Sequence, residues 1–87
     1  MEPKWKLFVM PDCVECESVK KWLDNHDTIE ELEIIVVHDD DTDILAETDF
    51  YDVFDVYPAL RPANGAGGWD GATSVLGALR DIAAGKM

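Results

Sequence analysis

Two cysteines separated by two residues, Cys13 and Cys16, constrain this chain more than any other feature of its sequence, and they are its only cysteines. They follow an apolar stretch at 5–10 that is typical of a buried strand. They precede a segment in which apolar residues recur at helical spacing. A dithiol on a strand-to-helix turn is typical of thiol–disulfide chemistry. The start of the helix favours a thiolate at Cys13, and Cys16 lies about one turn further on, within reach of a mixed disulfide formed by Cys13.

The sequence favours redox chemistry over other uses of the cysteine pair. A zinc site normally needs four ligands, and the chain adds only His26 and His38, neither of them at finger-like spacing from the cysteines. A structural disulfide is less favoured still, because so short a loop restrains the unfolded chain very little. Three hypotheses stay open. They are a dithiol electron donor, a metal or iron–sulfur handling module that uses both thiolates, and an interaction module in which the dithiol is incidental.

Charge is the second unusual property of the chain. Its 87 residues include 19 acidic and seven basic ones, for a formal net charge of −12. This balance argues against nucleic acid as a partner, because phosphate binding requires clustered lysine and arginine, and it argues against an anionic membrane surface. No run approaches the roughly 20 apolar residues of a membrane span, and nothing resembles a targeting segment. We therefore expect a single cytoplasmic domain over residues 1–87, monomeric and without a bound cofactor.

Strand and helix patterns alternate along the whole chain. The first strand, helix and second strand predict a right-handed unit with parallel strands. Between the second strand and the next helix, the acidic run at 39–43 predicts a solvated loop in which Thr42 or Asp43 caps the helix. A turn is expected at 61–65. The expected elements are a strand at 4–10, a helix at 14–26, a strand at 31–38, a helix at 44–54, a short strand near 56–60, a returning strand at 65–69 and a last helix from 73 or 74 to 84.

This order and length resemble the glutaredoxin branch of the thioredoxin superfamily over nearly the whole chain. Cys-Val-Glu-Cys at 13–16 is similar to the Cys-Val-Gln-Cys or Cys-Met-Gln-Cys of NrdH-type redoxins, more than to the Cys-Pro-Tyr-Cys of dithiol glutaredoxins. Trp-Asp-Gly at 69–71 is similar to the Trp-Ser-Gly of those redoxins. Val-Tyr-Pro at 56–58 falls where the family places a cis-proline beside the dithiol. Monothiol glutaredoxins match poorly, because Cys16 is present.

The resemblance implies both a fold and a set of roles. The fold is an α/β fold of the thioredoxin/glutaredoxin type, with a four-stranded mixed sheet flanked by three helices. Cys13 resembles the family's exposed nucleophile and Cys16 its buried resolving cysteine. Pro58 would hold the backbone of Tyr57 toward a substrate strand. Trp69 would support the site or cover partner surface, although its position is also consistent with plain core packing.

The resemblance also implies a function, the reduction of protein disulfides, with a ribonucleotide reductase as one acceptor that such redoxins serve. The reductant would be a thioredoxin-reductase-like flavoenzyme or, alternatively, glutathione. Asp12, Glu15 and Glu17 surround the first cysteine, and only Lys20 and Lys21 lie nearby on the helix. Because glutathione carries two carboxylates, this acidic rim favours the flavoenzyme.

Overall fold

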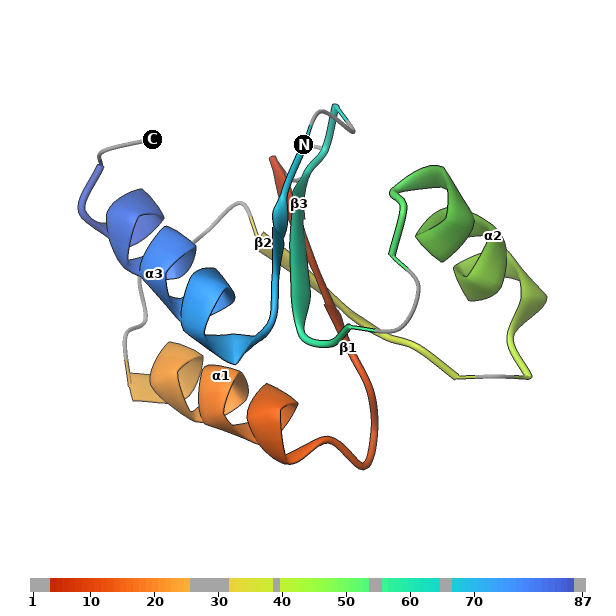
Figure 1. The fold of residues 1–87 in the computed structure, drawn as a ribbon, viewed down its shortest axis with the longest axis horizontal. Coiled ribbons are helices and arrows are strands. Elements are labelled where there is room, and N and C mark those ends of the chain that lie inside the picture. Colours follow the sequence, from red (N-terminus) through yellow and green to blue (C-terminus); the bar gives the residue numbers. More distant parts are fainter. Residues whose placement is uncertain (1–3, 26–31, 39, 54–55, 65–66, 86–87) are drawn as a thin grey trace.

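The computed structural model describes residues 4–25, 32–38, 40–53, 56–64 and 67–85. Three helices and four strands follow one another in the order expected from the sequence (Figure 1). The elements are β1 (Trp5–Val9), α1 (Val14–Asn25), β2 (Leu32–Val36), α2 (Thr42–Phe50), β3 (Ala59–Pro62), β4 (Trp69–Asp70) and α3 (Ala72–Ala83).

The four strands form one mixed sheet in the order β2-β1-β3-β4. β1 and β2 are parallel, with Trp5 beside Leu32 and Val9 beside Val36. This pairing confirms the parallel unit expected of a strand, a helix and a second strand. β3 is antiparallel to β1, and the short β4 is antiparallel to β3. The chain therefore has an α/β fold with a mixed sheet of four strands.

Helices cover both faces of this sheet, and each face has its own core. α1 and α3 lie on one side and α2 on the other (Figure 1). Successive residues of a strand point to opposite faces, so β1 contributes to both cores. The buried residues of the α1–α3 core are Leu7, Val9, Cys16, Val19, Leu60, Val75, Ala78 and Leu79. Those of the α2 core are Phe8, Ile35, Val37, Tyr51, Val53 and Ala59.

The second helix begins two residues earlier than expected, because a different residue caps it. Asp41 is the N-cap, and its Oδ1 accepts hydrogen bonds from the N–H groups of Asp43 and Ile44 at 3.1 and 3.2 Å. The expected caps, Thr42 and Asp43, both lie inside α2. The helix ends at Phe50, short of the expected end at 54, a position outside the described residues.

The β3–β4 region differs most from the sequence prediction. Arg61 and Pro62 were expected in a turn, but they belong to β3 and lie opposite Lys6 and Trp5 of β1. β4 begins only at Trp69. The returning strand predicted at 65–69 is wrong for Gly67 and Gly68, whose φ angles of 79° and 151° are not those of a strand. Positions 65 and 66 lie outside the described residues.

The remaining boundaries differ by a few residues. Gly71 is the N-cap of α3, which starts at Ala72, slightly before the expected position, and ends at Ala83. Gly85 follows with a φ of 74°, as suits a glycine that ends a helix. α1 ends at Asn25, and the expected helix end at His26 lies outside the described residues. In the part of the chain that the structure describes, no helix is long and apolar enough to cross a membrane.

Candidate functional site

The two cysteines lie where the chain passes from β1 into α1. Cys13 directly precedes Val14, the first residue of the helix. Its Sγ accepts a hydrogen bond from the N–H of Cys16 at 3.1 Å, and its carbonyl oxygen accepts one from the N–H of Glu17 at 3.0 Å. An oxygen of Ser, Thr, Asn or Asp usually accepts this kind of bond at a helix start. Here a sulfur does so, and it is thereby held among the free N–H groups of the helix.

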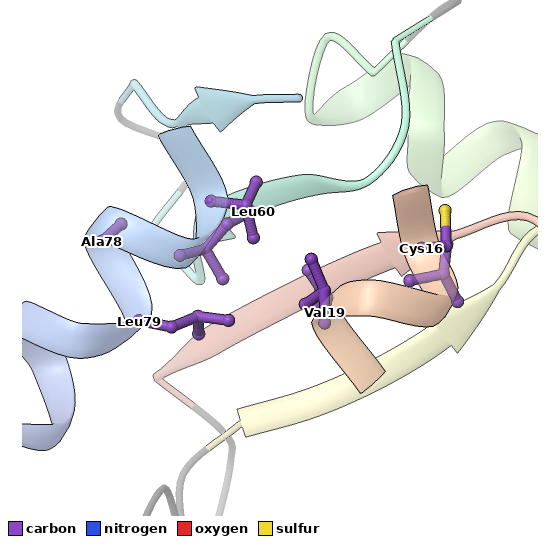
Figure 2. Close-up of a cluster of buried hydrophobic side chains, with 8 residues drawn as sticks. Cys16, Val19, Leu60, Ala78 and Leu79 are labelled. Carbon is purple, nitrogen blue, oxygen red and sulfur yellow. The ribbon is translucent and has the colours of Figure 1, made fainter. Parts of the chain in front are cut away.

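The two sulfurs form a disulfide but differ in exposure. Their Cα atoms are 5.1 Å apart, within the range that a disulfide spans. Cys13 is partly exposed, whereas Cys16 is fully buried. The Sγ of Cys16 accepts from the backbone N–H of Met10 at 3.5 Å. Figure 2 shows Cys16 in the α1–α3 core together with Val19, Leu60, Ala78 and Leu79. Only Cys13 is therefore accessible to another molecule in this state.

The segment before β3 lies beside the exposed sulfur. The carbonyl oxygen of Tyr57 is 4.0 Å from the Sγ of Cys13, across 44 positions of sequence. The peptide bond between Tyr57 and Pro58 is cis, as the resemblance to the glutaredoxin branch implied. Pro58 is fully buried, and its carbonyl oxygen accepts a hydrogen bond from the N–H of Gly71 at 2.9 Å. The structure thus brings together Cys13, Tyr57 and Pro58 and attaches this segment to the start of α3.

Trp69 has a different environment from the other expected site residues. Its ring packs against that of Trp5, with the ring centroids 5.9 Å apart. Trp5 is the first residue of β1, whereas the cysteine turn follows the last. Trp69 also packs against the α1–α3 core. These contacts favour core packing over a direct contact between Trp69 and a substrate.

Three acidic residues lie close to Cys13 in the sequence. Asp12, Glu15 and Glu17 are all exposed. Within the described residues, no lysine, arginine or histidine forms an ion pair with any of the three. Their carboxylates are therefore exposed to solvent, with no ion-pair partner in the part of the chain that the structure describes.

Two valines beside the site are exposed, and sequence reasoning missed both. Val14 exposes 83% of its surface and follows Cys13 directly. Val56 exposes 51% and precedes Tyr57. Valine is among the residues most often buried, so two exposed valines next to the contact between Cys13 and Tyr57 provide apolar surface for another molecule. Their positions beside the two motifs were the available signal.

A network around Arg61, on the α2 side of the sheet, was also missed. Arg61 is 6% exposed. Its five N–H groups are matched by five acceptors, so it is a structural link between β3, β4 and the residues that directly follow α2. Its Nε donates to Tyr51 O at 2.8 Å, Nη1 to Leu60 O at 3.1 Å and Trp69 O at 3.2 Å, and Nη2 to Asp52 O at 3.2 Å and Asp70 Oδ1 at 2.7 Å. An arginine between Leu60 and Pro62 was the only signal of this network in the sequence.

Lys6, which lies opposite Arg61 on β1, extends the polar groups on this side. Its Nζ forms an ion pair and hydrogen bond with Glu47 of α2, and it lies 3.6 Å from a carboxylate oxygen of Glu33. The hydrogen bond to Glu47 is the main cause that raises the pKa of Lys6 above 10.5, with burial acting in the opposite direction. This ion pair fastens α2 to the middle of the sheet.

In the described ranges, no three or more His, Cys, Asp or Glu side chains are grouped so that they could hold a metal ion. No protein-family model, curated protein or solved structure matches the chain.

Proposed function

We propose that this chain is a small dithiol oxidoreductase of the glutaredoxin branch of the thioredoxin superfamily and that it reduces disulfides in proteins. The observation that carries the proposal is the unequal exposure of two sulfurs at the start of α1. Cys13 is accessible, and Cys16 is buried about one turn further on. The mixed sheet, its three helices and the Tyr57–Pro58 segment beside Cys13 are compatible with a thioredoxin-like fold.

The proposed reaction needs only the two cysteines and the substrate disulfide. The Cys13 thiolate attacks one substrate sulfur, so that a mixed disulfide forms while the other substrate sulfur leaves as a thiolate and takes up a proton. Cys16, after losing its proton, then attacks Cys13. The second substrate sulfur leaves, and the Cys13–Cys16 disulfide forms. Two electrons pass from the dithiol to the substrate, and the disulfide form described above is the oxidised product.

The start of α1 suits Cys13 to the first step. A thiolate is the attacking species, and the N–H of Cys16 is already directed at the Cys13 sulfur. The dipole at the helix N-terminus also favours a negative charge there. Cys16 cannot compete for the substrate while it is buried, so it can act only after Cys13 has formed the mixed disulfide.

The acidic rim favours a flavoenzyme of the thioredoxin-reductase type as the reductant. Glutathione would bring two carboxylates toward Asp12, Glu15 and Glu17, and none of these is neutralised by a described ion pair. A ribonucleotide reductase is one candidate acceptor. Oxidised protein incubated with NADPH and such a flavoenzyme, or with glutathione, should regain its thiols faster with the flavoenzyme; faster recovery with glutathione would contradict this choice.

The two serine variants test the division of roles. Cys13→Ser should abolish the reduction of a disulfide-bonded protein, because the accessible nucleophile is lost. Cys16→Ser should instead accumulate a mixed disulfide through Cys13, which non-reducing electrophoresis and mass spectrometry would detect. Trapping through Cys16 in the Cys13→Ser protein, with none in the Cys16→Ser protein, would reverse the assignment. Unchanged activity in both variants would refute the proposal.

A further inference from the structure

The charged residues nearest to the accessible sulfur in the sequence are all acidic. Asp12 precedes Cys13, Glu15 lies between the two cysteines, and the N–H of Glu17 donates to the carbonyl of Cys13. The nearest basic residues on α1 begin at Lys20. Lys20 lies seven positions after Cys13, which corresponds to about 10 Å along the helix axis.

A bound substrate must lie close to these carboxylates, because its cysteine forms a disulfide bond with Cys13. The two sulfurs of that bond lie about 2 Å apart. The residues that flank the substrate cysteine therefore come well within the screening length of exposed charges, about 10 Å at 0.1 M salt. Val14 and Val56 meanwhile provide apolar surface close to the substrate cysteine.

We propose, on the basis of the proposed function, that Asp12, Glu15 and Glu17 are specificity-determining residues that select disulfides flanked by basic residues. Attraction between opposite charges raises the rate of encounter and disfavours partners of the wrong sign. The substrate class is thus a protein segment with lysine or arginine on either side of an apolar position next to the cysteine. Acidic segments, and small acidic disulfides, are disfavoured by the same charges.

Two synthetic peptides with one internal disulfide each provide the test. They share a valine beside the cysteine that is attacked and differ only in the flanking positions, which are lysine in one and glutamate in the other. Fully reduced wild-type protein in excess is mixed with each peptide, without any reductase, and the rate constant for reduction is measured. At about 0.01 M salt, where the screening length is roughly 30 Å, we expect the lysine peptide to react about tenfold faster. This ratio should approach unity at about 1 M salt.

Two triple variants distinguish the effect of the acidic rim on this ratio from the effect of the net charge of the protein. Asp12→Asn, Glu15→Gln and Glu17→Gln together should reduce the ratio toward unity at low salt. The matched control combines Asp24→Asn, Asp49→Asn and Asp81→Asn, three exposed carboxylates that are distant from Cys13 in the sequence. This control should retain most of the wild-type ratio. Because both peptides are attacked by the same sulfur, the ratio does not depend on how reactive Cys13 is in each variant.

Equal rates for the two peptides at low salt would overturn the inference, and so would a control variant that loses as much selectivity as the rim variant. In both cases the proposed function would stand, because the peptides would still be reduced. If wild-type protein reduced neither peptide nor a disulfide-bonded protein, the proposed function would be overturned, and this inference with it.

Discussion

Replacing Arg61 with methionine should destabilise the chain more than any single change in the acidic rim. The side chain of Arg61 is 7% exposed, and its bonds to the carbonyls of Tyr51 and Leu60 are buried. Each buried acceptor that loses its donor costs about 1–3 kcal/mol. Methionine fills much of the space of the arginine stem, so the cavity cost is small. Together with the weaker, part-buried bonds we expect a loss of about 3–5 kcal/mol in the free energy of unfolding, against about 5–15 kcal/mol for a typical domain.

A matched variant of Asp70, the ion-pair partner of Arg61, separates the contribution of the ion pair from that of the hydrogen bonds between Arg61 and main-chain carbonyls. Asp70 is 51% exposed, and in Asp70→Asn the amide oxygen still accepts from Arg61. This change should cost about 1 kcal/mol or less. Urea denaturation of the oxidised proteins, followed by tryptophan fluorescence and extrapolated to water, measures both losses. The reasoning is refuted if Arg61→Met costs less than about 1 kcal/mol or no more than Asp70→Asn.

Three further changes test other parts of the structure. Gly68→Ala would place a Cβ 2.5 Å from the side chain of Arg61 and 2.6 Å from the carbonyl oxygen of Leu60 in β3. It should lower the free energy of unfolding, measured by urea denaturation, by about 2–3 kcal/mol. Gly67→Ala, with open space around its Cβ, should cost only about 1 kcal/mol for its positive φ. Glu47→Gln removes the main cause of the raised pKa of Lys6. The stability difference from wild type should therefore be fully present below pH 10.5 and decline as the pH rises above it, when Lys6 loses its proton, as urea denaturation on both sides of this pH would show. Asp41→Ala should cost about 1 kcal/mol in thermal unfolding, and Asp41→Asn, which keeps a capping oxygen, should cost much less.

The parts of the fold that depend on local pattern were predictable from the sequence. The alternation of β-branched runs and helical stripes predicted the order of seven elements, and the element between the first two strands required those strands to be parallel. The position of the dithiol followed from the residues around it. The expectation that Cys13 is accessible and Cys16 buried came from the resemblance to a family, and the structure agrees with it.

Features that depend on pairing between distant segments were not predictable in the same way. Asp41, Thr42 and Asp43 are all acceptable caps by residue type, and only the backbone geometry selects Asp41. Arg61 next to a proline resembles a turn, and its place in a strand becomes evident only when β1 lies beside it. Its burial depends on carbonyl groups from Tyr51 and Asp52, which follow α2, and from Trp69 of β4, and no local pattern could reveal these.

The apolar surroundings of Cys16 have a consequence for where its proton goes. Its neighbours in the α1–α3 core are aliphatic, and its hydrogen-bond partner, the N–H of Met10, is a donor that cannot accept a proton. Among the described core residues on that side, none can serve as a base. In the proposed reaction we therefore expect the proton of Cys16 to pass to water or to the substrate sulfur that departs as Cys16 attacks. In the second case the proton moves from Cys16 to the departing substrate sulfur while the mixed disulfide is replaced by the Cys13–Cys16 disulfide. The proton affinity of the substrate thiolate would then help to set how quickly the complex is released.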